Sequence, residues 1–325
     1  MSVLPVDSLS TPRFVGLPSF MRLPLATSLA GLDAAIIGLP SDSGAPYRTG
    51  ARFGPNALRA MSVMLRPINP SRGNINVFEV LKVADAGDAN VVPGYEIESL
   101  ALMERSVATL VDAGVIPCAI GGDHSVSLAA LRAVAHRHGP VGLIHFDSHT
   151  DTWDSYFDGK RYSAGTMFRR AVEEGLIDPS RSIQIGLRGS LFQPTDVSQS
   201  EDLGYRVITC DEMFDLGLRE VARLVAERAG RGPSYASFDL DFVDPAFAPG
   251  VQTPECGGPS AREALALVRM IRGVTLVGFD VVELNPLYDG PGQITALLGA
   301  TILAEFLALI AETRLQATTS PQNKP

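Results

Sequence analysis

The stretch SFDLDFVDPAFAPG, residues 237–250, places two carboxylates inside an apolar run. Asp239 and Asp241 are two residues apart, so an extended chain points both side chains to the same face. Buried carboxylates on one face repel each other strongly unless positive charge lies beside them. The stretch therefore predicts a buried strand whose carboxyl end needs a bound cation.

Strand-like and helix-like segments alternate along the chain around this stretch. Apolar strand-like runs occupy 33–40, 115–125, 140–151, 182–189, 205–213, 233–244 and 274–286, and helical periodicity covers 96–114, 127–139, 217–230 and 260–273. Continuous apolar strands that alternate with helices predict an α/β fold with a mainly parallel sheet, covered by helices on both faces. Segments 41–75 and 86–95 are expected to be long surface loops.

No polar linker divides the 325 residues, and 46% of them are hydrophobic, which is enough for one large core. We therefore expect an N-terminal arm over 1–32, a single catalytic domain over 33–316 and a flexible tail over 317–325.

Composition argues against several classes of partner. A net charge of -9 disfavours nucleic acid, because phosphate binding relies on basic patches. Three widely spaced cysteines and no apparent targeting segment favour a cytoplasmic protein with reduced thiols. The apolar stretch 294–312 carries Glu305 and Glu312, which favours a buried helix over a membrane span.

Three expected strands end in side chains that commonly bind metals. The motifs are GGDHS with His124, DSHTD with Asp147, His149 and Asp151, and FDLD with Asp239 and Asp241. Each motif alone also fits a turn or a helix cap. Together they offer imidazole and hard oxygen ligands at one edge of a sheet, which suits a pair of divalent ions, Mn²⁺ first and Ni²⁺ as an alternative.

Such a pair of ions has a defined chemistry. Two metals about 3.5–4 Å apart bridge one water, lower its pKa and so supply hydroxide at neutral pH. One of the ligating carboxylates can hold that hydroxide and accept its proton. The residues alone therefore point to hydrolysis.

The motifs GGDHS, HFDSHTD and SFDLDFVDPAFAPG resemble the signatures of the ureohydrolases, the arginase and agmatinase family, over residues 33–312. The agmatinase-like branch is indicated by SDSGAPYRTGARFGP, GTMFRRAVEEGLID and VGFDVVELNP. The resemblance implies a three-layer α/β/α sandwich and a hydrolase of the C–N bonds of linear amidines, releasing urea or a urea derivative and an amine. It also implies a homo-oligomer, a trimer or hexamer.

The resemblance also implies roles for individual residues. Asp151 is expected to orient the bridging hydroxide, Glu283 to bind the guanidinium of the substrate, and Thr253 to lie near the substrate. The expected metal ligands are His124, Asp147, His149, Asp151, Asp239 and Asp241.

One departure from the branch removes a histidine. Ala164 stands where agmatinases have a histidine that contacts the substrate or moves a proton. No other histidine is an evident replacement: His136 and His138 lie on an expected surface helix, and His145 is expected to face the flank of the site or the core.

Further departures lie beside the expected substrate. Val251 and Gln252 replace two small residues before Thr253, and Ser148 replaces an alanine and adds a hydroxyl. Trp153 is expected to line the pocket or to pack beneath its loop. Arg48 is the cation we would test against a carboxylate-bearing substrate, with a solvated loop arginine as the other interpretation. Residues expected to discriminate among substrates are Tyr47, Arg48, Arg188, Gln252 and Tyr288.

These departures leave the substrate open. A pocket without the histidine predicts a substrate other than plain agmatine: a guanidinobutyrate-like acid, a free or N-alkylated guanidine, or a biguanide such as metformin. The alternative is a metal-binding but weakly active subunit of a hetero-oligomer with an active paralogue. Metal-dependent deacetylases share a similar sandwich but carry a tandem histidine pair, which this sequence lacks.

Overall fold

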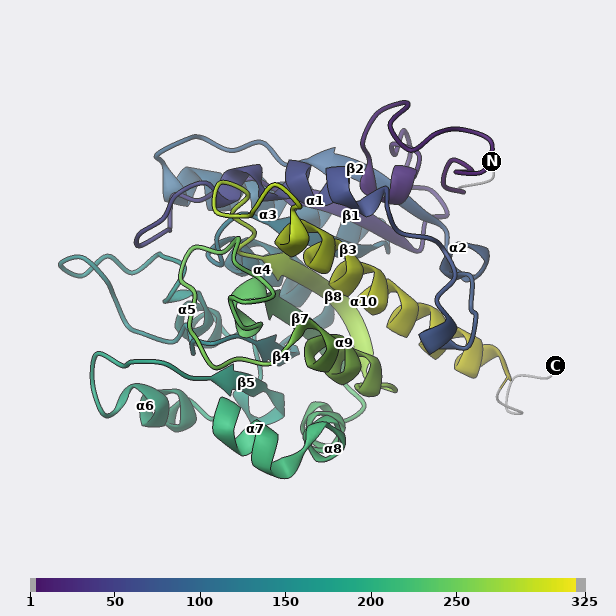
Figure 1. The fold of residues 1–325 in the computed structure, drawn as a ribbon. Helices are drawn as coiled ribbons and strands as arrows, with labels where there is room; N and C mark the ends of the chain where they lie inside the picture. Colours follow the sequence, from purple (N-terminus) through teal and green to yellow (C-terminus); the bar gives the residue numbers. More distant parts are fainter. Residues whose placement is uncertain (1–3, 320–325) are drawn as a thin grey trace.

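A computed structural model describes residues 4–319 and contains one eight-stranded, wholly parallel sheet (Figure 1). The order of the strands is β2-β1-β3-β8-β7-β4-β5-β6. Their bounds are β1 Ala34–Leu39, β2 Val83–Asp88, β3 Ile116–Gly121, β4 Gly142–Phe146, β5 Ile183–Leu187, β6 Arg206–Thr209, β7 Pro233–Asp239 and β8 Thr275–Val282. The predicted parallel sheet is confirmed.

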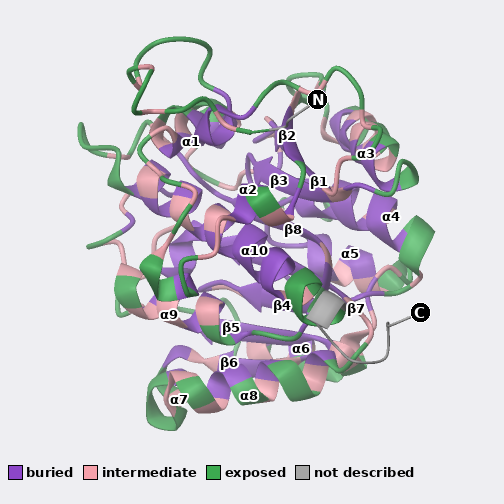
Figure 2. Ribbon diagram, turned by 90° about the vertical axis from the view of Figure 1, so that its right-hand side faces the viewer, coloured by how far each residue is buried: buried purple, intermediate pink, exposed green. Residues whose placement is uncertain are grey.

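Helices cover both faces of the sheet and complete the three predicted layers. One face carries α3 (Glu96–Asp112), α4 (Val126–His138), α5 (Met167–Glu173) and α6 (Asp196–Asp202); the other carries α1 (Gly54–Ser62), α7 (Cys210–Leu216), α8 (Leu218–Ala229), α9 (Ala261–Met270) and α10 (Ile294–Thr319). A short helix, α2 (Val77–Val80), packs against α10. Along β1, Ile36 joins the core under α10 while Ile37 joins the core under α3 and α4, so successive side chains supply opposite faces. Figure 2 shows the strands largely buried between these layers.

Helix α10 is the apolar stretch that the sequence analysis assigned to the core. Within residues 4–319 it is the one helix long and apolar enough to cross a membrane, but 78% of its apolar window is buried inside the fold. Its carboxylates are paired: Glu305 lies 2.5 Å from Arg72 and 2.6 Å from Arg269, and Glu312 lies 3.2 Å from Arg72. The helix therefore packs as a core helix.

Three expectations about loops and termini need correction. Segment 41–75 is not a loop throughout, because α1 begins at Gly54 with a proline in its first turn. Within the expected N-terminal arm, Phe20 is fully buried and its N–H donates to the Asp85 carboxylate at 2.8 Å. Helix α10 continues to Thr319, so the first residues of the expected tail are helical; the remainder of that tail lies outside the described residues.

The four central strands position the candidate site. Strands β3, β8, β7 and β4 are neighbours and parallel, so their carboxyl ends lie side by side. His124 follows β3, Glu283 follows β8, Asp239 ends β7, and Asp147 follows β4. Ligands of parallel sheets bind at such an edge.

Candidate metal centre

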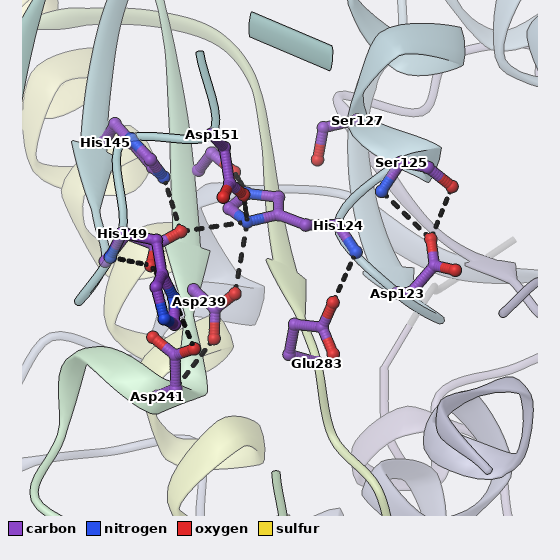
Figure 3. A network of polar contacts seen from close by, with 12 residues as sticks. Asp123, His124, Ser125, Ser127, His145, His149, Asp151, Asp239, Asp241 and Glu283 are labelled. Atoms are coloured by element: carbon purple, nitrogen blue, oxygen red, sulfur yellow. Dashed lines mark hydrogen bonds and ion pairs between the residues drawn. The ribbon is translucent and has the colours of Figure 1, made fainter. Parts of the chain in front are cut away.

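The six predicted metal ligands converge above these strands. His124 Nδ1 lies 3.0 Å from Oδ2 of both Asp147 and Asp151, and 3.1 Å from Oδ2 of Asp239. Figure 3 shows Asp151 and Asp239 pointing toward the ring of His124. One imidazole nitrogen and three carboxylate oxygens therefore share one small volume.

A second group of ligands adjoins the first. His149 Nδ1 lies 3.1 Å from Asp241 Oδ2 and 3.3 Å from Asp147 Oδ1. Asp147 thus presents one oxygen to each group, as a carboxylate that bridges two metal ions does. All these side chains are buried except His149, which is 19% exposed.

Hydrogen bonds from the protein orient the carboxylates of Asp147, Asp239 and Asp241. Asp147 Oδ1 accepts the His149 N–H at 2.6 Å, and Asp239 Oδ1 accepts the Asp241 N–H at 2.7 Å. Asp241 Oδ1 accepts both the N–H and the hydroxyl of Ser148, at 3.1 and 2.7 Å. The serine noted in the sequence therefore orients a candidate ligand.

Hydrogen bonds behind His124 determine which of its nitrogens faces the carboxylates as an acceptor. Ser237 Oγ donates to Asp280 at 2.6 Å, so it can only accept from His124 Nε2, 2.8 Å away. Ser127 and Tyr235 donate to the other oxygen of Asp280, at 2.7 and 2.8 Å. The buried Nδ1 has no hydrogen-bond partner and faces three carboxylate oxygens, so it needs a proton or a metal ion there. A divalent ion fits this donor set, because it binds all four groups and carries more charge.

A further chain of polar contacts holds Asp147. His145 Nε2 lies 2.8 Å from Asp147 Oδ2, and Gln184 Nε2 donates to His145 Nδ1 at 3.0 Å and to the Thr150 carbonyl at 2.6 Å. Because the Thr150 carbonyl can only accept, Gln184 Nε2 must face it and the amide cannot be reversed. His145 Nδ1 therefore accepts from Gln184, and His145 donates to Asp147 through Nε2. His145 and Asp147 are two residues apart on an extended chain, so the sequence indicated that their side chains lie on the same face. The contact with Gln184 was not predictable, because it depends on the pairing of β4 with β5.

The pKa shifts of the clustered aspartates indicate that this site requires additional positive charge. Burial raises the pKa of Asp239 well above its ordinary value, and the charges of Asp241 and Asp147 raise it further. Burial and the charge of Asp147 also raise the pKa of Asp151. Burial opposes ionisation of Asp147 as well, but the neighbouring His145, His124 and His149 hold its pKa well below the usual range. Carboxylates that repel in this way are those a metal pair would neutralise.

Two ligand-bearing turns adopt a left-handed backbone. Asp151 has φ 52° and Glu283 has φ 66°. Positive φ is uncommon outside glycine and concentrates at functional sites. At Glu283 the turn is held by its N–H, which donates to the Gly122 carbonyl at 2.9 Å, and its carboxylate accepts the His124 N–H at 2.7 Å. The backbone thus aims Glu283 into the site (Figure 3).

An open cavity of about 480 Å³ leads to this centre. His149, Asp151 and Asp239 line its inner end. The cavity is also lined by every residue predicted to contact substrate, namely Thr253, Glu283, Gln252, Ala164, Trp153 and Arg48. Trp153 packs edge-on against Tyr156 and Phe192, which also line the cavity, with ring centres 5.5 Å apart in both pairs. Their contacts with substrate stay predictions.

A model of the arginase family matches residues 32–309. The chain belongs to the arginase family. It is 45% identical to a guanidinopropionase of Pseudomonas aeruginosa, over 95% of this chain and 96% of that protein. It is 46% identical to a mitochondrial agmatinase of Gallus gallus, over 92% of this chain and 87% of that protein. Among solved structures, proclavaminate amidino hydrolase from Streptomyces clavuligerus matches with a TM-score of 0.89 and 42% identity, covering 93% of this chain and 100% of that one.

Family membership confirms the predicted resemblance and the class of enzyme, a hydrolase of C–N bonds in guanidino compounds. The family uses a pair of divalent metals, and the cluster of histidines and aspartates described above is a matching site. The deacetylase alternative is thereby excluded.

Two of the residues expected to discriminate among substrates, Arg188 and Tyr288, are not among those that line the cavity. Tyr288 instead packs against the Arg48 guanidinium. The guanidinium of Arg188 donates to the carbonyls of Asp241 at 2.7 Å, Phe242 at 3.0 Å and Glu255 at 3.1 Å. The guanidinium of arginine has five N–H donors, so it can form hydrogen bonds to several backbone carbonyls at the same time. Arg188 therefore holds the two ends of the loop that carries Gln252.

We expect Arg188→Met to lower metal affinity and turnover, by about tenfold each, because even one lost hydrogen bond from a charged donor costs about 1.5–3 kcal/mol. Metal titration and kcat measured at saturating metal check this result. Arg206→Met is the matched control, since Arg206 lies on the adjacent strand and pairs with Glu212 near the surface. Equal behaviour of the two variants would contradict the positioning role.

Proposed function

We propose that this chain hydrolyses a linear guanidino carboxylic acid, and that Arg48 binds the carboxylate. The observation that carries the proposal is the distribution of charge in the cavity. Of the described residues that line it, Arg48 is the only lysine or arginine. The lining carboxylates are Asp151, Asp239 and Glu283, near the metal centre, and Glu255 on the loop that follows Thr253. A guanidino acid has the inverse arrangement, a cation at one end and an anion at the other, so the charges are complementary.

Arg48 is held in place but has no ion-pair partner among the described residues. Its guanidinium carbon lies 4.6 Å from the ring centre of Tyr288 and 5.8 Å from that of Tyr47. Asn285 Nδ2 donates to the carbonyls of Arg48 and Thr49 at 3.1 and 3.2 Å, which anchors the loop. A stacked, anchored guanidinium is suited to bind a carboxylate through two hydrogen bonds.

The chemistry follows from the residues around the metal centre. A metal pair, when bound, supplies Lewis acidity and a water activated at neutral pH. Asp151 lies at the cavity and is placed to take the proton of the attacking water and to return it to the leaving nitrogen. The oxygen of the water bonds to the guanidinium carbon, the bond from that carbon to the alkylated nitrogen breaks, and urea and an amino acid result. Ala164 offers no proton, so Asp151 serves both steps.

We expect Arg48→Met to lower kcat/KM for guanidino acids by about 10- to 100-fold, because a hydrogen-bonded charge pair is lost. The rate on an uncharged N-alkylated guanidine should change little. Urea release from 3-guanidinopropionate, 4-guanidinobutyrate, agmatine, N,N-dimethylguanidine and metformin measures the preference. Arg105→Met, on the exposed face of α3, is the control.

Two outcomes would overturn this proposal. One is a wild-type preference for metformin or an alkylated guanidine over every guanidino acid. The other is an equal loss on charged and uncharged substrates in Arg48→Met, which would mark Arg48 as a structural loop residue.

We further propose that the metals are Mn²⁺, with Ni²⁺ as the alternative, and that the chain is an active cytoplasmic homo-oligomer of three or six copies. The complete ligand set supports activity, since a chain without catalysis has no need to hold repelling buried carboxylates. The purified chain loaded with each metal, assayed alone and sized by light scattering, tests this. Turnover that appears only after a second, different chain is added would favour the structural-subunit alternative.

A further inference from the structure

We propose that Glu255 is a specificity-determining residue, whose negative charge opposes the effect of Arg48 and limits the preference of the cavity for acidic substrates. This inference rests on the proposed guanidino hydrolase and concerns the tail of the substrate, not its guanidinium. Glu255 and Arg48 both line the cavity that leads to the metal centre, and their charges have opposite signs. A charged tail that enters this cavity is therefore attracted by one of the two residues and repelled by the other.

Glu255 is the one carboxylate of the cavity lining that plays no part in the metal centre. The other three, Asp151, Asp239 and Glu283, are buried beside that centre. Glu255 is partly exposed, and its carboxylate has no hydrogen-bond or ion-pair partner among residues 4–319. Its charge is therefore available to a ligand in the cavity.

Two neighbours hold Glu255 at the wall of the cavity. Arg188 donates to the carbonyl of Glu255 from Nε at 3.1 Å and from Nη2 at 2.8 Å, which fixes the backbone of the loop at this residue. The side chain of Glu255 lies over Gly189, where a Cβ atom would overlap Glu255 Oε2. Gly189 also has φ 81°, a conformation that favours glycine. A larger residue at position 189 would displace the carboxylate, so glycine there keeps Glu255 in place.

A carboxylate in this position changes the binding energy of a charged tail in a defined direction. Like charges in a partly exposed cavity repel and opposite charges attract, with a strength that falls with distance and with salt concentration. A guanidino acid is therefore stabilised by Arg48 and destabilised by Glu255, whereas a guanidino amine shows the reverse. The binding of a neutral tail depends on neither charge.

The test compares three guanidino compounds that differ mainly in the charge of the tail, namely 4-guanidinobutyrate, n-butylguanidine and agmatine. Their kcat/KM values are measured at low salt on manganese-loaded wild type, Glu255→Gln and Glu255→Asp, and the association constant from calorimetry replaces kcat/KM for a compound that is not hydrolysed. Glu255→Gln should raise the value for the acid about fivefold, lower that for agmatine about fivefold and leave that for butylguanidine within about twofold. Glu255→Asp, which keeps the charge, should stay close to wild type.

Asp112→Asn is the control, because Asp112 is exposed at the end of α3, just before β3 begins, and so lies at the opposite edge of the sheet. At about 0.5 M salt the changes caused by Glu255→Gln should shrink to about twofold or less, since salt screens a charge effect but not a packing effect. An unchanged ratio of acid to amine in Glu255→Gln, or an equal change for all three compounds, would overturn the inference. Failure of the guanidino acid proposal is separate: wild type then prefers butylguanidine or agmatine, while the effects of Glu255→Gln on acid and amine keep their opposite signs.

Discussion

Asp239→Ala and Asp241→Ala each abolish turnover, with kcat at least about a thousandfold lower, because losing several kcal/mol of metal-based stabilisation has that effect. Each also removes metal. Asp239 contributes to the group around His124, and Asp241 to the group around His149, so each variant should retain fewer than two ions per chain. Elemental analysis beside a urea assay measures both.

Asp215→Asn, on the exposed side of α7, is the control and should keep both ions and full turnover. Substituting either ligand leaves the packing of β7 intact, because both side chains lie at or beyond its carboxyl end. Full activity with two ions in either variant would show that the carboxylates serve another purpose.

Without bound metal, the folded protein should become less stable as pH rises. This is the opposite of ordinary acid denaturation, in which stability is lost as pH falls. Burial raises the pKa of Asp239 and of Asp151, so the folded state holds their protons more tightly than the unfolded state does. Three neighbouring carboxylates likewise raise the pKa of His124 well above its ordinary value, although burial opposes this. For all three groups, the folded state loses stability as pH rises through the folded pKa.

Metal-free protein should therefore unfold at lower temperature at about pH 8.5 than at about pH 5.5, whereas metal-loaded protein should not. Asp147 does not reverse this, because its lowered pKa contributes stability that is lost only at more acidic pH. Thermal melts with and without a chelator at the two pH values measure the effect. A metal-free protein more stable at the higher pH would contradict the account of the repelling carboxylates.

The parallel sheet and the convergence of the candidate ligands could be predicted from the sequence because both depend on local patterns. Apolar runs that end in polar residues identify parallel strands, and parallel strands bring their carboxyl ends together wherever they lie in the chain. His124, Asp147 and Asp239 could be assigned to one edge without knowing the order of the strands. The order itself, with β8 inserted between β3 and β7, was not predictable from these patterns.

Features that depend on tertiary contacts were missed. Arg188 was expected to discriminate among substrates, yet its guanidinium donates to three carbonyls of a loop more than 50 residues away. The hydrogen bonds that Gln252 Nε2 donates to Glu283 depend on a left-handed turn at Glu283 that no local pattern indicates. Helix α1 was missed because glycine and proline surround it, although both residues suit its first turn.

Urea release by the purified chain, measured together with its metal content, tests the central claim most directly. We predict two divalent ions per chain and equimolar urea and amino acid from 3-guanidinopropionate or 4-guanidinobutyrate, with no second protein present. A chain that binds both ions and yet releases no urea from any guanidino compound would contradict the claim.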